Sequence, residues 1–259
     1  MPELPDLQVF SHNLTKILKG KELKKITIVY TKKIKVPQKE FKNKLEKQSV
    51  RKVYREGKEL RFEFSNGNIL GMHLMLKGQL YLYEKKNEHK RTIAELLFTD
   101  GIGLALDDYQ GQATITLNPE ISKTPDALSK ETNLAFFKRE LATTGTTIKN
   151  FLLDQHKLRG IGNAYADEIL WDARISPFSV CRKIPEEKIK QLVKSIKKIL
   201  KWAEKQVNKF APGTITGESR EFLPIHNSKN RRSPNGAPIL TDQAGGRKTY
   251  YTKEQKLYK

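Results

Sequence analysis

The feature that most constrains this chain is a change in its hydrophobic pattern near Pro125. Between residues 25 and 118, short runs rich in Val, Ile, Leu, Phe and Tyr alternate with polar residues, which is typical of half-buried strands. Asn66-Gly67 and Asp100-Gly101 separate some of these runs as turn signals. We therefore expect an α+β fold, with a β-sandwich or barrel of short strands before Pro125 and a helical region after it.

Helical periodicity predicts five helices, at residues 5–19, 127–141, 146–156, 164–171 and 186–207. The last is the clearest, because Ile189, Leu192 and Ile196 share one face and Pro185 precedes its first turn. A basic connection rich in Gly and Pro leads to two predicted strands, 236–242 and 247–252, joined by a glycine-containing turn at 243–246. We expect three domains, at residues 1–125, 126–212 and 213–259.

The charge balance favours a polyanionic partner. The chain has 49 Lys and Arg against 29 Asp and Glu, a net charge of +20, and this pattern favours nucleic acid over a merely solvated basic surface. Cys181 is the single cysteine, so one chain can form neither a disulfide nor a cysteine-rich metal site. Because the chain has no apolar run of about 18 residues and no secretory leader pattern, we expect a cytoplasmic protein without a membrane span.

The second residue offers a nucleophile. Removal of Met1 before a small residue would expose the secondary amine of Pro2, in the sequence MPELPD. An α-amine titrates near ~7.7–8.0 against ~10.4 for a lysine, so far more of it is neutral and nucleophilic at neutral pH. Glu3 stands beside this amine, where a carboxyl can donate and accept protons. The alternative is that Glu3 only complements the positive end of the first helix.

Several motifs resemble those of the formamidopyrimidine-DNA glycosylase and endonuclease VIII family. They are MPELPD, Gly57-Lys58, His73-Leu74 with Lys77-Gly78, and LRGIGNAYADEILWDARISP from Leu158 to Pro177. The resemblance spans nearly the whole chain and implies an N-terminal β-sandwich flanked by helices, a helix-two-turn-helix domain and a C-terminal hairpin finger. It also implies action without a cofactor on double-stranded DNA containing damaged bases or abasic sites. Nothing in the sequence demands more than a monomer.

The same resemblance assigns the chemistry. It implies a bifunctional base excision repair enzyme, a glycosylase and abasic-site lyase, in which Pro2 is the nucleophile and Glu3 transfers protons. Lys58 is implied as a catalytic and phosphate-contacting residue. Without the family, Lys58 would be interpreted as an ordinary exposed charge on a hairpin.

DNA contacts are implied farther along the chain. Asn163 corresponds to a phosphate contact, and the amides of Gly160 and Gly162 would come close to phosphate beside it. Arg247 matches a finger arginine that grips phosphates, for which a guanidinium is well suited. Lys157 is a weaker candidate for the same surface.

The finger departs from the family pattern. Positions where most relatives hold zinc with cysteines are occupied here by Arg232, Asn235, Thr252 and Gln255. These side chains supply no thiolate or imidazole, so we expect a zincless finger and no bound metal.

Other departures concern the substrate. Residues 107–111 replace the arginine and phenylalanine that many relatives insert into the vacated duplex, so Leu76, Tyr109 or Gln110 could fill this space or be structural side chains. In some relatives a loop closes over an oxidised purine, and by that resemblance residues 217–223 are too few to form it, which leaves oxidised pyrimidines or ring-opened purines open. Asp6 replaces a glutamate near the nucleophile, which could change rate or base choice. Alternative functions are a damaged-DNA-binding protein and a lyase without base excision.

Overall fold

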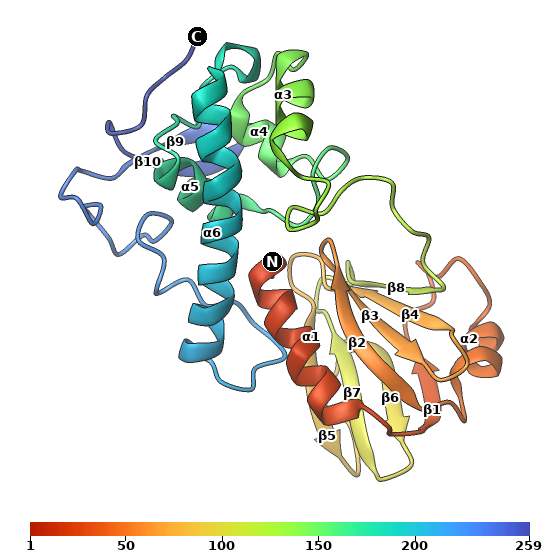
Figure 1. The fold of residues 1–259 in the computed structure, drawn as a ribbon. Helices are drawn as coiled ribbons and strands as arrows, with labels where there is room; N and C mark the ends of the chain where they lie inside the picture. Colours follow the sequence, from red (N-terminus) through yellow and green to blue (C-terminus); the bar gives the residue numbers. More distant parts are fainter. The chain divides into compact units, whose positions relative to one another are not determined.

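The computed structural model describes residues 1–259 and divides into two compact units (Figure 1). The first unit comprises Met1–Ile121 and Val207–Glu218, and the second comprises Ser122–Gln206 and Ser219–Lys259. None of the helices has the length and apolar character that crossing a bilayer demands.

The first unit contains two four-stranded antiparallel sheets. One has the order β1-β6-β7-β5 and the other the order β2-β3-β4-β8. The bounds are β1 Leu23–Ile28, β2 Val50–Glu56, β3 Glu59–Phe64, β4 Ile69–His73, β5 Gln79–Glu84, β6 Thr92–Phe98, β7 Ile102–Asp107 and β8 Thr114–Leu117. One apolar cluster draws on both sheets, with Phe62 and Leu70 from one and Leu96 and Leu104 from the other, all fully buried. The predicted β-sandwich is confirmed.

Helix α1, Leu4–Leu18, begins with Pro5 in its first turn and covers this core with Leu7, Phe10 and Leu14. Its predicted boundaries are right to within one residue. Helix α2, Gln38–Leu45, was not predicted, because its only apolar side chains, Phe41 and Leu45, give too little periodicity to detect.

The second unit begins with three short helices, α3 Leu134–Ala142, α4 Ile148–Leu153 and α5 Asn163–Asp172, followed by a 3₁₀ turn η1 at Cys181–Lys183. The long helix α6, Glu186–Phe210, leads from this unit into the first. The predicted start of α3 at residue 127 was wrong. The Asp126 carboxylate accepts the Leu128 N–H, the Thr132 hydroxyl donates to carbonyls, and Asn133 caps the helix. These side-chain bonds favour turns over an earlier helix start.

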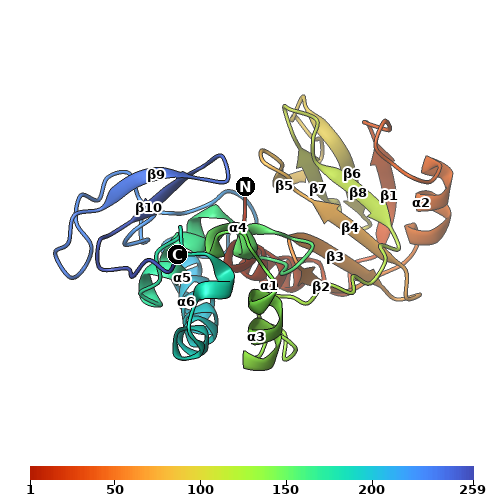
Figure 2. The ribbon, with the colours of Figure 1, turned by 90° about the horizontal axis from the view of Figure 1, so that it is seen from above.

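The C-terminal hairpin consists of β9, Leu240–Ala244, and β10, Arg247–Tyr251, and lies beside α4 and α5 in both ribbon views (Figures 1 and 2). The predicted four-residue turn was wrong, because Ala244 pairs with Arg247 and only two glycines connect the strands. Gly245 and Gly246 have φ values of 58° and 71°, as a tight twisted hairpin turn requires. A Cβ on Gly245 would also come within 2.3 Å of the Asn150 side chain, so the turn packs closely on α4.

Candidate functional site

Strand register brings three turns to one end of the sandwich. Glu59 pairs with His73 and His73 with Thr114, so the β2–β3 turn, the end of β4 and the start of β8 are neighbours. In the other sheet Gln79 pairs with Asp107, which places the start of β5 beside the end of β7. The turn that carries Lys58, the turn at 74–78 and the turn at 108–113 therefore share this end, which we call the turn end.

Helix α1 lies along β2, with its N-terminal end on the side of the turn end. The Thr15 hydroxyl donates to the Val53 carbonyl and accepts the Val53 N–H, both at 2.8 Å. Nearer the N-terminus of α1, the Gln8 side chain accepts from the Arg55 Nε at 3.1 Å. Arg55 also donates to the Gly57 carbonyl at 2.9 Å. Moving back along α1 thus means moving along β2 toward the turn that carries Lys58.

Pro2 and Glu3 lie immediately before α1, and both are buried. Glu3 is the N-cap residue, and its N–H donates to the Asp6 carboxylate at 2.8 Å. Asp6 is fully buried and belongs to this capping interaction. The Asp6 side chain, which is shorter than the glutamate of relatives, therefore caps the N-terminus of α1.

A segment distant in sequence joins this N-terminus. The Met1 ammonium lies 2.9 Å from the Glu218 carboxylate. Thr214 accepts from the Asn13 side chain at 2.8 Å, and Thr216 accepts from the Leu80 N–H at 3.2 Å. Residues 214–218 therefore line α1 and the start of β5, a proximity that no local sequence pattern could indicate.

Lys58 lies near His73, at the end of β4. Burial, and secondly the positive charge of Lys58, lower the pKa of His73, so its imidazole is neutral at neutral pH. Its Nδ1 accepts the Met75 N–H at 3.0 Å, and Met75 has a left-handed φ of 52°. This bond shapes the turn in which Leu76 is exposed.

Tyr109 and Gln110 are exposed in the turn between β7 and β8. Buried Asp108 shapes this turn, since its carboxylate accepts the N–H groups of Gln110, Gln112 and Ala113 at 2.7–2.9 Å. The two side chains thus occupy the turn end together with Leu76.

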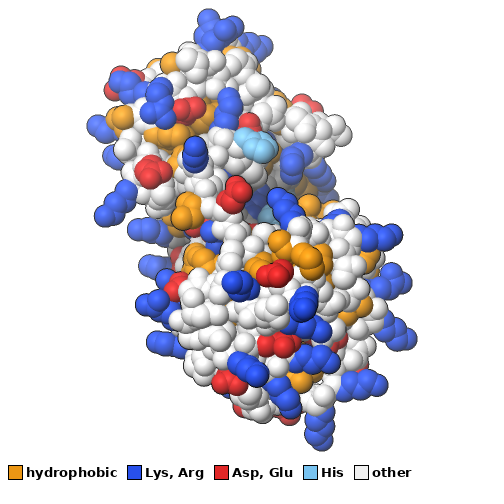
Figure 3. All heavy atoms as spheres, turned by 90° about the vertical axis from the view of Figure 1, so that its right-hand side faces the viewer, with side chains coloured by type: hydrophobic (Ala, Val, Ile, Leu, Met, Phe, Trp, Pro, Cys, Tyr) orange, Lys and Arg blue, Asp and Glu red, His pale blue; other side chains and the backbone are white.

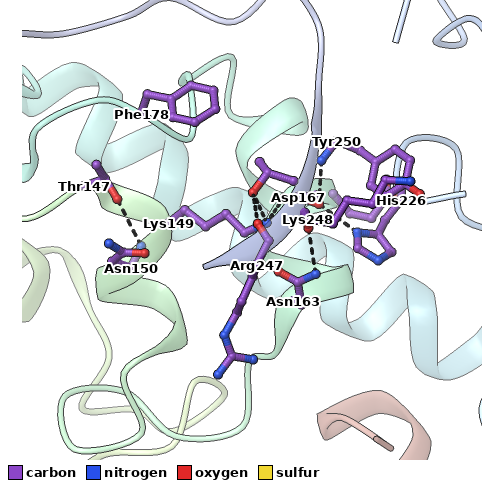
Figure 4. Close-up of polar contacts among 12 residues, drawn as sticks. Thr147, Lys149, Asn150, Asn163, Asp167, Phe178, His226, Arg247, Lys248 and Tyr250 are labelled. Atoms are coloured by element: carbon purple, nitrogen blue, oxygen red, sulfur yellow. Dashed lines mark hydrogen bonds and ion pairs between the residues drawn. The ribbon is translucent and has the colours of Figure 1, made fainter. Parts of the chain in front are cut away.

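In the second unit, Asn163 contacts Lys248, the neighbour of Arg247, across 85 residues of sequence. Asn163 is the first residue of α5, and its Nδ2 donates to the Lys248 carbonyl at 2.9 Å (Figure 4). Arg247 and Lys248 are both exposed at the start of β10. The close-up shows the Arg247 guanidinium pointing away from the hairpin (Figure 4).

The loop before α5 is tied by its own hydrogen bonds. Gly160 donates its N–H to Gln155 at 2.9 Å, so this amide has a partner within the chain. Lys157 donates to the Thr144 hydroxyl at 3.3 Å, and its ammonium lies 5.7 Å from the centre of the Phe151 ring. The side chain of Lys157 is therefore already held by contacts within the chain.

A buried ion pair anchors the hairpin, and sequence reasoning missed it. Lys149 on α4 and Asp167 on α5 are 2.6 Å apart with both side chains fully buried (Figure 4). Lys149 also donates to Thr249 at 2.8 Å, while Asp167 accepts the Tyr250 N–H at 3.0 Å and lies 2.7 Å from His226 Nδ1. A lysine beside apolar Ile148 and Phe151 was the one signal available in the sequence.

Glu168, next along α5, holds the segment that precedes the hairpin. Its Oε1 accepts the N–H groups of Ile225 and His226 at 2.9 and 2.7 Å. Burial, the largest influence, raises the pKa of Glu168 to about 8 from an ordinary value of 4.5. The carboxyl is therefore mostly protonated at neutral pH.

Glu168→Gln is expected to flatten the pH dependence of stability. Between about pH 4.5 and about pH 8 the folded chain holds a proton on Glu168 that the unfolded chain has released, so the free energy of unfolding falls as pH rises through this window. Glutamine stays neutral and removes that fall. Urea unfolding at about pH 5 and about pH 8 measures the free energy of unfolding of both proteins. If this free energy changes between the two pH values by the same amount in both proteins, the assignment is wrong.

The surface carries the excess of positive charge broadly. Lys and Arg side chains are spread over the whole visible face, and Asp and Glu side chains are fewer (Figure 3). With a net charge of +20, such a surface attracts a long polyanion such as nucleic acid.

Known proteins match both units. Residues 1–115 match the formamidopyrimidine-DNA glycosylase N-terminal domain, and residues 124–210 match the formamidopyrimidine-DNA glycosylase H2TH domain. A formamidopyrimidine-DNA glycosylase of Lactobacillus gasseri is 34% identical over 218 residues, which cover 80% of this chain and 78% of that protein.

Solved structures agree along the whole chain. The wild-type Lactococcus lactis Fpg (MutM) in complex with DNA containing an oxidised pyrimidine has a TM-score of 0.85 and 27% identity. The Lactococcus lactis Fpg in complex with DNA containing an abasic site has a TM-score of 0.85 and 26% identity. Each match covers 97% of this chain and 98% of the other.

Proposed function

Because the chain belongs to the formamidopyrimidine-DNA glycosylase family, we propose that its Pro2 amine excises damaged bases and cleaves the DNA strand. The protein is a base excision repair enzyme that acts on damaged DNA. The observation that carries the nucleophile assignment is the position of Pro2 before α1, whose N-terminal end lies along β2 on the side of the turn that carries Lys58.

The chemistry begins when removal of Met1 leaves the Pro2 nitrogen as the chain terminus. That nitrogen forms a bond to C1′ of the damaged nucleotide, the bond from C1′ to the base breaks, and the base leaves with a proton. A proton is then transferred to the sugar ring oxygen, the bond from C1′ to this oxygen breaks, and the nitrogen lone pair forms the C1′=N⁺ bond of an iminium ion. The iminium ion acidifies the C2′ proton, and loss of this proton expels the 3′ phosphate. No cofactor takes part in these steps.

Glu3 and Lys58 assist these reaction steps in different ways. The Glu3 carboxyl, adjacent to Pro2, donates a proton to the sugar ring oxygen and later accepts one. The Lys58 ammonium, at the turn end, contacts the phosphate beside the damaged nucleotide. The nearby His73 is neutral, so the positive charge at this turn comes from Lys58 and from Arg55, which donates to the Gly57 carbonyl.

The second unit contributes phosphate contacts. Exposed Arg247 offers a planar guanidinium for bidentate contact, and the bond from Asn163 to the Lys248 carbonyl keeps these residues together. Asn163 retains a second amide hydrogen for phosphate. Lys157 remains a weaker candidate because Thr144 and Phe151 already engage it.

The turn end supplies candidates to fill the space left by a flipped nucleotide. Leu76 is 51% exposed and Tyr109 is 57% exposed, although large apolar side chains are usually buried. Gln110 is exposed beside Tyr109. Stacking of such side chains against the neighbouring bases offsets the cost of extruding one nucleotide.

The lesion class that we propose is oxidised pyrimidines and ring-opened purines. Residues 214–218 pack on α1 and β5, which leaves few residues for a loop over an oxidised purine. The Lactococcus lactis relative, solved with an oxidised pyrimidine in its DNA, supports this choice.

A panel of duplexes tests the function with one enzyme preparation. The duplexes carry an abasic site, an oxidised pyrimidine, a ring-opened purine or an oxidised purine, and borohydride traps the covalent complex. We expect cleavage and trapping with the abasic duplex and base release from the second and third duplexes. Abasic cleavage without base release would indicate a lyase only, and binding without either activity would indicate a damaged-DNA-binding protein.

A further inference from the structure

One carboxylate gathers partners from three segments at the base of the C-terminal hairpin. Glu254 Oε2 accepts from the Trp171 indole at 3.2 Å, from the Ser233 hydroxyl at 3.0 Å and from the Thr252 hydroxyl at 3.2 Å. Glu254 Oε1 accepts from Asn235 at 2.8 Å and forms an ion pair with Arg174 at 2.9 Å. We call these six residues the Glu254 cluster.

The positions at which relatives hold zinc meet in and around this cluster, and their side chains do not fit a metal. Asn235 and Thr252 use their donor groups on Glu254. Gln255 accepts the Thr252 N–H at 2.8 Å and donates to the Ile175 carbonyl at 2.9 Å, and Arg232 donates to the Gly236 carbonyl at 2.8 Å. Zinc needs thiolate, imidazole or carboxylate ligands, and none of these four residues offers one.

We propose that Glu254 is a positioning residue that takes the place of a metal ion in cross-linking the finger. A carboxylate has two oxygens with about four lone-pair sites, so it can accept several donors at once. Hydrogen bonds to an ionised acceptor are roughly twice as strong as neutral ones. The cluster therefore joins the end of α5, the segment around Ser233 and the end of β10 through one negative charge.

The surroundings of Glu254 favour its ionised form. The hydrogen bond from Asn235, followed by those from Trp171 and Ser233 and the charge of Arg174, lowers the pKa of Glu254 to about 2. Arg174 also stacks over the Trp171 ring, with its guanidinium carbon 5.1 Å from the ring centre. Trp171 in the last turn of α5 and Arg174 just after the helix thus pack against each other beside the carboxylate.

Strand β10 connects the Glu254 cluster to Arg247. Thr252 follows this strand at its base, and Arg247 begins it at the turn. Loss of the Glu254 cluster would release the base of β10, so Arg247 would spend less time in position to contact phosphate. This consequence rests on the proposed DNA-binding role of Arg247.

The test uses Glu254→Ala and Glu254→Gln, with Glu221→Ala as the matched control. Glu221 lies in the same C-terminal segment but has one exposed ion pair, with Lys229 at 3.4 Å. Hydrogen exchange of the β9 and β10 amides is expected to accelerate about tenfold or more in Glu254→Ala, less in Glu254→Gln, and not in the control. Unchanged exchange in Glu254→Ala would overturn the proposal, as would slowing of that exchange by added zinc in the parent protein.

DNA binding then tests the link to Arg247. In Glu254→Ala the slope of log affinity against log salt is expected to become shallower by about 1, as in Arg247→Ala, with no further change in the double variant. Additive losses would overturn the positioning role. If Arg247→Ala binds like the parent protein, the DNA contact of Arg247 is wrong, while the exchange experiment still decides the role of Glu254.

Discussion

Pro2→Gly, which replaces the secondary amine by a primary one, is expected to lower single-turnover base release on the order of 10³-fold, less than complete removal of a covalent nucleophile costs. Proline forms a Schiff base without an N–H, which remains a cation at every pH, whereas the imine of glycine must bind a proton to become an equal electron sink. Borohydride trapping on an abasic duplex and base release from a lesion duplex measure the two half-reactions. Trapping is expected to fall with base release.

Pro5→Ala provides the matched control, because Pro5 lies in the first turn of α1 and carries no free amine. Alanine is a good helix former, so α1 and the buried Leu4 and Leu7 around it should remain in place. Full trapping by a protein whose terminal amine has been chemically blocked would show that another amine attacks. The nucleophile assignment would also be wrong if mass spectrometry found Met1 still attached in fully active enzyme.

Lys149→Met is expected to lower the free energy of unfolding by about 3–5 kcal/mol. The substitution leaves the Asp167 carboxylate fully buried without its cation, while the contacts to His226 and the Tyr250 N–H persist. Urea unfolding measures this loss. Because Lys149 also donates to Thr249 on β10, the affinity for duplex DNA should fall as the hairpin loosens.

An ion pair at the surface with the same nitrogen–oxygen distance provides the control. Lys198 and Asp172 are also 2.6 Å apart, but the Lys198 side chain is 68% exposed. Lys198→Met should therefore cost less than about 1 kcal/mol. A double variant of Lys149→Met with Asp167→Asn should recover part of the loss, because no buried charge is left unpaired. Equal losses for Lys149→Met and Lys198→Met would contradict the role of the buried pair.

Periodicity was sufficient for most of the secondary structure. The strands around Phe62 and Leu96 and the long helix containing Leu192 were predicted because one face of each is apolar over several turns or alternations. The start of α3 and the hairpin turn were wrong because individual side chains decided them. Thr132 and Asn133 delayed the helix, and Gly245 and Gly246 shortened the turn.

The candidate catalytic residues were identified from motifs, and their roles remain predictions. Strand register placed Lys58, Leu76 and Tyr109 at one end of the sandwich, an outcome that follows from pairings such as Gln79 with Asp107. No spacing in the sequence contains that information, because the paired residues are far apart along the chain.

By itself, the sequence determined the order of the elements, the excess positive charge and the motif residues Pro2, Glu3 and Lys58. Only the tertiary structure decided that Lys149 pairs with Asp167 and that five side chains converge on Glu254. The physical reason is that a charged residue looks alike in a sequence whether water or a buried partner compensates it. The compensating partner comes from another segment, and folding alone brings the two together.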